Sequence, residues 1–150
     1  MPAQVPLEDL EHALFWVSSP PDLEAEAYIC RTTGKIYTRG PDGPIEEDFP
    51  EDIEDGTFYL AFPDKNELDL GKHLVLQFIE QYAPSASSEV RAMFSRRGAY
   101  GRLKSLLQRL RMLDNWHQYE REATTIALRN WATEHGFEVT STNRQVRGAA

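Results

Sequence analysis

The sequence has a single cysteine, and it lacks the features that mark secreted and membrane proteins. Cys30 has no partner for an internal disulfide, so nothing indicates an oxidising compartment. No apolar run approaches the roughly 20 residues that a membrane-spanning helix needs. The first residues, MPAQVPLEDLEH, also lack the basic and apolar regions of a secretory signal. We therefore expect a cytoplasmic protein without a membrane segment.

Motifs that carry catalysis or hold a cofactor are missing as well. The four histidines, His12, His73, His117 and His135, do not follow a metal-ligand spacing such as HExxH. No glycine-rich loop is suited to a phosphate group. We therefore predict no catalytic, cofactor-binding or metal-binding residue, and an enzyme with an unfamiliar site stays the less favoured alternative.

The chain does have the length of one domain and a very uneven distribution of charge. Its 150 residues can bury a core without disulfides or metals. The formal net charge is -8, but residues 1–69 hold 17 carboxylates against 4 basic residues, whereas residues 70–150 hold 7 against 12. Such asymmetry marks either an interaction surface or two halves that pack together through complementary charge.

Hydrophobic periodicity predicts an α+β fold. A helix is expected over 7–17, then strands over 26–31 and 35–39 that form a hairpin around Gly34, and a third strand over 57–62. Helices follow over 69–82, 88–97, 103–113 and 114–136, and a last short strand over 137–140. We therefore predict a small antiparallel sheet, a hairpin plus a third strand, followed by a bundle of four to five helices packed on it. Residues 1–140 should form a single globular domain, and residues 141–150 a disordered tail.

Several residues are predicted to mark where the helices begin and end. Asp69 and Asp114 are expected caps at helix starts, because an aspartate accepts hydrogen bonds from the first backbone N–H groups. Gly98 is the expected cap at the end of the helix over 88–97.

Five blocks of sequence follow one another along the chain: EAYICRTTGKIY, DFPEDIED, FPDKNELDLGKHLVLQFIEQ, RRGAYGRLKSLL and DNWHQYEREATTIALRNW. Through these blocks, residues 8–139 resemble the bacterial family called uncharacterised protein family 0158. RGAY at 97–100 and WHQYE at 116–120 are the most characteristic pieces. Leu103 and His117 stand where the resemblance leads us to expect aromatic residues. The resemblance implies no particular activity, because none is established for the family.

The stretch MFSRRGAYGRLKSLLQ at 93–108 is strongly basic. Residues 91–113 contain seven basic residues and no carboxylate. On a helical wheel, Arg102 and Arg109 lie on one side of the leucine stripe, and Lys104 and Arg111 lie on the other. Two flanking rows favour a structural role, in which the aliphatic stems cover the edge of the core and the charged heads reach water.

An external partner is the alternative role for this basic segment. The possible contacts with a partner or anion are Arg91, Arg96, Arg97, Arg102, Lys104 and Tyr100. A phosphate-binding helix would gather its cations on one ridge, and the net charge of -8 repels a polyanion at long range. We therefore expect a non-catalytic protein-interaction module, and RNA or DNA binding through residues 91–111 is the alternative.

Residues 40–56 are predicted to be an exposed acidic loop. EEDFPEDIED at 46–55 places seven carboxylates in ten positions, and their mutual repulsion favours water. The segment lacks the alternating ligands and the glycine of a calcium loop. A solvated loop is the favoured interpretation, and a contact with the basic residues or with a partner protein is the alternative.

Two single residues, Glu120 and Cys30, lie where their surroundings decide their role. Glu120 falls on the apolar stripe of the last helix, where an unpaired buried charge would cost several kcal/mol. We therefore favour a structural ion pair that joins two helices, with a possible hydrogen bond from Tyr100. A functional carboxylate at the rim of a pocket is the alternative. Cys30 is expected to be a structural residue, because no nearby sequence feature would lower its pKa.

Overall fold

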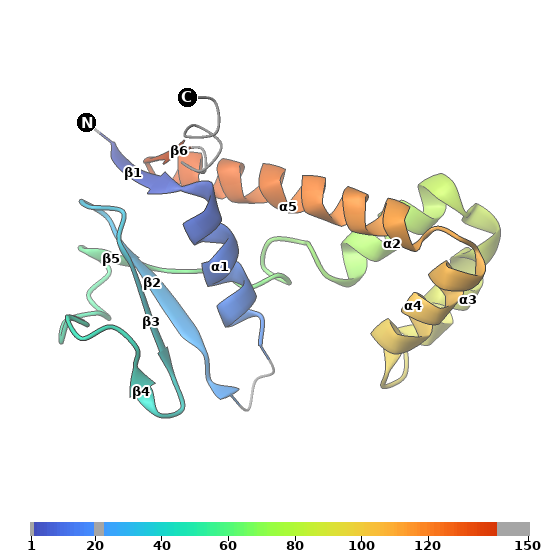
Figure 1. Cartoon of the computed structure of the whole chain (residues 1–150), viewed down its shortest axis with the longest axis horizontal. Coiled ribbons are helices and arrows are strands. Elements are labelled where there is room, and N and C mark those ends of the chain that lie inside the picture. Colours follow the sequence, from blue (N-terminus) through green and yellow to red (C-terminus); the bar gives the residue numbers. More distant parts are fainter. Residues whose placement is uncertain (1, 20–22, 141–150) are drawn as a thin grey trace, which may run out of the picture. The chain divides into compact units, whose positions relative to one another are not determined.

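A computed structural model describes residues 2–19 and 23–140, and the chain divides into two compact units (Figure 1). The sheet unit comprises the described residues up to Lys65 and from Thr125 onward; the helical unit comprises Asn66–Thr124. The predicted α+β class is confirmed. The predicted tail over 141–150 lies outside the described residues. The single globular domain over 1–140 stays a prediction, because compact units can fold together or alone.

The sheet unit contains an antiparallel sheet with the strand order β4-β3-β2-β5. These strands are β2 (Glu26–Cys30), β3 (Ile36–Gly40), β4 (Gly43–Pro44) and β5 (Tyr59–Ala61). The predicted hairpin is confirmed, with Tyr28 opposite Tyr37. Gly34 has a φ of 78°, and a Cβ at this position would lie 2.3 Å from the backbone oxygen of Gln4. The turn therefore requires glycine for both its backbone angle and its close approach to the first strand.

A second, parallel sheet joins segments from near the two ends of the chain. β1 (Ala3–Pro6) pairs with β6 (Phe137–Thr140), and Ala3 lies opposite Phe137. The strand over 137–140 is predicted by the sequence, but β1 is not. A four-residue strand has too little alternation to be recognised, and its partner is remote in the sequence.

The helix α1 (Leu7–Val17) packs on one face of the antiparallel sheet. Leu10, Ala13 and Leu14 are its buried residues. The indole N–H of Trp16 donates to the backbone oxygens of Glu26 and Arg39, at 3.1 and 3.2 Å. Trp16 thereby fixes the end of α1 to both strands of the hairpin.

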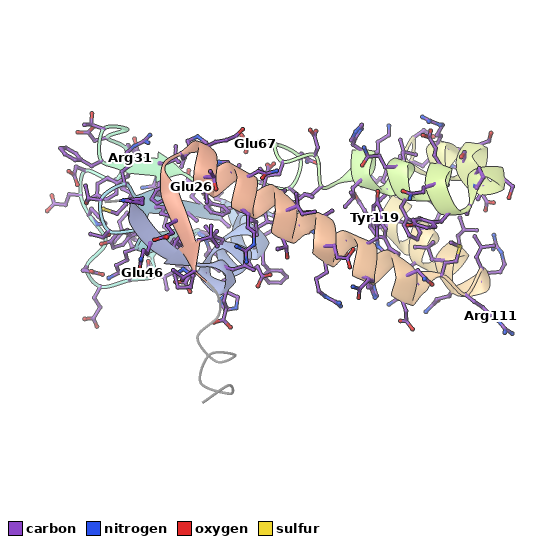
Figure 2. All side chains as sticks on the ribbon, turned by 90° about the horizontal axis from the view of Figure 1, so that it is seen from above. Glu26, Arg31, Glu46, Glu67, Arg111 and Tyr119 are labelled. Carbon is purple, nitrogen blue, oxygen red and sulfur yellow. The ribbon has the colours of Figure 1, made fainter. Side chains whose placement is uncertain are left out.

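The helical unit contains α2 (Lys72–Tyr82), the 3-10 turn η2 (Pro84–Ala86), α3 (Ser87–Met93), α4 (Ala99–Arg109) and the first part of α5 (Leu113–Glu134). Phe78 of α2 is 1% exposed and lies at the centre of this unit. Its ring contacts those of Tyr82, Trp116 and Tyr119, with centroids 5.1–5.4 Å apart. Figure 2 shows Tyr119 on the side of α5 that faces α2. These aromatic contacts join α2 to α5.

Several predicted helix boundaries are wrong. Asp114, an expected cap, already lies in the first turn of α5, which begins at Leu113. Asp69 has a φ of 58° and does not cap α2, which begins only after Gly71. The helix expected over 88–97 ends at Met93, and Gly98 instead lies immediately before α4 with a φ of 75°. Residues 94–98 thus form a turn that lets α4 start four residues earlier than the leucine stripe predicts.

The stripe predicted for α5 is partly wrong. The apolar residues at helical spacing from Trp116 include Ile126, which is 60% exposed, whereas Leu128 is fully buried. The buried residues Leu128, Trp131 and Ala132 define the inner side of α5 within the sheet unit. A periodicity taken over the whole helix does not identify this local face.

Candidate functional site

The basic segment 91–111 makes two ion pairs within the helical unit. Arg91 pairs with Glu80, and Arg109 pairs with Glu89 at 3.4 Å. Arg109, one of the arginines beside the leucine stripe, thus pairs with a carboxylate of the same chain. All four partners in these pairs are more than half exposed, so the pairs contribute little to stability.

The other cations of this segment face solvent. Arg96, Arg97, Arg102, Lys104 and Arg111 are exposed, and none forms an ion pair with a carboxylate in the described part of the chain. Arg102 instead donates to the backbone oxygen of Arg97. Figure 2 shows Arg111 at the turn between α4 and α5, with its side chain directed away from the helices. These five cations are available to an external anion.

An aromatic pair lies beside the start of α4. The rings of Phe94 and Tyr100 meet edge to face with centroids 5.4 Å apart, and the amine of Lys72 lies 6.0 Å from the Phe94 centroid. Tyr100 is 55% exposed. Partial burial, and secondarily the negative charge of Glu120, raise the pKa of the Tyr100 hydroxyl.

Glu120 is half-buried on α5, and it acts electrostatically on Tyr100 of α4. The structure thus brings together two of the residues that the sequence analysis singles out. The predicted hydrogen bond from Tyr100 and the ion pair between helices stay predictions.

Cations of the hairpin contact the acidic loop. Lys35 pairs with Asp48 at 2.5 Å, and Arg39 pairs with Glu54 at 3.2 Å. Arg39 also pairs with Glu26, and this hydrogen bond raises the pKa of its guanidinium. The loop therefore contacts basic residues of its own sheet unit.

The acidic loop is only partly the solvated segment that the sequence predicts. Its carboxylates are mostly exposed, but Ile53 is 3% exposed and Phe49 packs against the ring of Tyr37. The short strand β4 at its start was not predicted. No group of three potential metal ligands occurs among residues 2–19 and 23–140. Apolar side chains fix this loop to the sheet, and most of its carboxylates are exposed.

Cys30 lies at the end of β2 and is half-buried. Its sulfur lies 3.3 Å from the Thr32 hydroxyl oxygen. Burial raises the pKa of the thiol, but hydrogen bonds from Thr32 and Thr33 outweigh this effect and lower the pKa from 9.0 to about 7. The expectation that no nearby feature lowers this pKa is therefore wrong, because the hairpin turn itself supplies the donors.

A groove that the sequence does not predict lies between α1 and the edge of the hairpin. This α1–β3 groove has a volume of about 520 Å³, and its apolar walls are Trp16 of α1, Ile36 of β3 and Ile45. Asp9, Lys35 and Glu46 also line it. Figure 2 shows Glu46 in the sheet unit. The one signal in the sequence is Ile45, an apolar residue that starts an acidic segment and is 61% exposed.

Comparisons of the chain with protein-family models, with curated proteins and with solved structures find no match. The resemblance to uncharacterised protein family 0158 therefore stays a prediction. Within the described residues, the helices are too short or too polar to span a membrane.

Proposed function

We propose that the protein is a non-catalytic interaction module of the cytoplasm, and that it binds another protein through the α1–β3 groove. The observation that carries this proposal is the exposure of Ile45 beside the groove. Most large apolar residues in the described part of the chain are buried or half-buried, and a large exposed apolar side chain at a concave site is typical of a binding surface.

The construction of the groove supports a binding role. Trp16 is held by two hydrogen bonds to the hairpin, so its ring presents a fixed apolar wall. Glu46 is held by the backbone N–H of Thr38 at 2.7 Å. A preorganised surface of this kind loses little side-chain entropy when a partner binds.

Two matched variants test the proposal. Ile45 and Ile126 are exposed to nearly the same extent, 61% and 60%, and both belong to the sheet unit, but only Ile45 lines the groove. The full-length chain and its Ile45→Glu and Ile126→Glu variants are used to isolate partners, and each isolated partner is then purified and titrated. We expect Ile45→Glu to weaken binding at least about tenfold, by loss of apolar contact and insertion of a charge. Equal binding by Ile45→Glu and the wild type would refute the proposal.

Nucleic-acid binding through residues 91–111 is the alternative function. It is favoured by the five basic residues that lack a carboxylate partner in the described chain and by the exposed ring of Tyr100. Aromatic rings and unpaired cations together are typical of single-strand binding.

Retention on immobilised polynucleotide separates the two functions. If residues 91–111 bind phosphates, the wild type should be retained at low salt and should elute only as the salt concentration rises. Replacing Arg96, Arg97, Arg102 and Lys104 by glutamine should abolish this retention. Elution of the wild type at low salt, without a difference from the variant, would exclude this alternative.

A further inference from the structure

The α1–β3 groove combines apolar walls with two carboxylates that form no ion pair with a described residue. Asp9 of α1 lines the groove and forms no ion pair with a described residue. Glu46 accepts hydrogen bonds from the backbone N–H and the hydroxyl of Thr38, at 2.7 and 3.1 Å. Because a carboxylate can accept about four hydrogen bonds, Glu46 keeps free acceptor positions for a ligand.

The one lysine of the groove acts electrostatically on Glu46 but forms its ion pair with Asp48, and His12 also lines the groove. The amine of Lys35 is bound by Asp48 at 2.5 Å and lies 5.0 Å from the ring centroid of Tyr37. Tyr37 neighbours Ile36 on the strand and therefore points to the opposite face of the sheet. Lys35 lines the groove, but its amine lies over Tyr37, on the other face of the strand, where Asp48 compensates its charge.

The sheet unit as a whole also attracts cations. Its two segments contain 17 carboxylates and 7 basic residues. A basic segment approaching this surface is therefore favoured at long range, and an acidic one is repelled.

We propose that the α1–β3 groove binds one arginine or lysine side chain of a basic partner segment. The aliphatic stem of this side chain lies against Trp16, Ile36 and Ile45, and its cationic head is bound by Asp9 and Glu46. This inference rests on the proposed function, because it specifies the partner of the same groove.

Other ligand classes fit the groove less well. A neutral apolar group would remove water from two carboxylates without replacing their hydrogen bonds, and this desolvation is costly. An anion would meet the same carboxylates at close range. A long side chain with an apolar stem and a cationic head satisfies both the walls and the charges.

Two small probes test the charge requirement. The full chain is titrated with n-butylguanidinium and with n-butylurea, which has a similar shape and no charge, and binding is followed by NMR through the indole N–H of Trp16 and the amide of Ile36. We expect the cation to bind at least about tenfold more tightly, because its hydrogen bonds to carboxylates are charge-assisted. Equal binding of both probes, or no response of Trp16 and Ile36 to the cation, would overturn the inference.

Isosteric variants show which carboxylates bind the head group. The double variant Asp9→Asn and Glu46→Gln should weaken binding of n-butylguanidinium about tenfold or more. The control, Asp42→Asn and Glu47→Gln, removes the same charge from exposed residues outside the groove and should change the affinity by less than about twofold. Equal weakening in both double variants would mean that the acidic surface attracts cations without a site.

The partner isolated through Ile45 separates this inference from the proposed function. If the partner binds through Ile45 but tolerates Asp9→Asn with Glu46→Gln, the inference fails and the proposed function stands. If Ile45→Glu has no effect, the proposed function itself fails. The partner can also be a second copy of the chain, bound through its basic segment 91–111. The wild type would then self-associate in sedimentation, and the variant Asp9→Asn with Glu46→Gln would remain monomeric.

Discussion

The two units use their basic residues in opposite ways. The segments of the sheet unit hold 17 carboxylates against 7 basic residues, and Lys35 and Arg39 of the hairpin both bind carboxylates of the acidic loop. The helical unit holds 7 carboxylates against 9 basic residues, and five cations of its basic segment have no carboxylate partner among the described residues. In the sheet unit two cations of the hairpin bind carboxylates of the acidic loop, whereas most cations of the basic segment in the helical unit face solvent.

The largest expected difference between the units concerns two glycines with left-handed backbone angles. An added Cβ at Gly34 would lie 2.3 Å from a backbone oxygen, whereas at Gly98 it would only touch the Arg102 side chain at 3.7 Å. Gly34→Ala should therefore lower the free energy of unfolding by about 3 kcal/mol or more, and Gly98→Ala by about 1 kcal/mol. Urea unfolding followed by circular dichroism measures both. Equal losses would show that the close contact at Gly34 is relieved by small movements.

The next largest difference concerns two arginines. Arg39 pairs with Glu26 and Glu54, lies over the ring of Tyr28, and its side chain is 26% exposed. Arg39→Gln should cost about 2 kcal/mol of unfolding free energy, as expected for partly buried, charge-assisted hydrogen bonds. Arg109→Gln should cost less than about 0.5 kcal/mol, because its pair with Glu89 is exposed.

The same measurement decides the role of the arginines beside the leucine stripe. Suppose that the double variant Arg102→Gln with Arg109→Gln lowers the free energy of unfolding as much as Arg39→Gln does. That result would show that the two rows of cations stabilise the helical unit more than their exposure indicates.

The smallest expected effect is a change in the reactivity of Cys30. Because its folded pKa is lowered to about 7, the thiolate fraction and the rate of alkylation by iodoacetamide should rise steeply around neutral pH. Thr32→Val removes one hydrogen bond to the sulfur and should move this rise toward the ordinary value of 9.0. A pH profile that is the same in the variant and the wild type would show that the threonine hydroxyl does not stabilise the thiolate.

Local sequence patterns predict most of the elements but not their contacts. The helix over 7–17, the hairpin around Gly34 and the α+β class follow from periodicity and turn chemistry, and all are confirmed. β1 was missed because its pairing with β6 is a long-range contact that short strands do not encode. The expected cap at Asp69 is wrong because Asp69 adopts a positive φ, which a hydrophobic pattern does not reveal.

The candidate site could be predicted only in part. The charges of residues 46–55 and 91–111 are visible in the sequence, and so is the proximity of Tyr100 and Glu120 as a hypothesis. The α1–β3 groove was missed because its walls come from α1, β3 and the start of the acidic loop. In the folded chain, the hydrogen bonds of Trp16 to the hairpin join α1 to these strands.

The central claim is that the α1–β3 groove binds a basic segment of another protein, and site-specific photo-crosslinking in the native cell tests it most directly. A photoreactive phenylalanine analogue is placed at Ile45 in one variant and at Ile126 in the other, because the two side chains are almost equally exposed. We predict a crosslinked protein from position 45 alone, with the crosslink mapped by mass spectrometry next to a lysine or arginine. The same products from both positions, or crosslinks from neither, would contradict the claim.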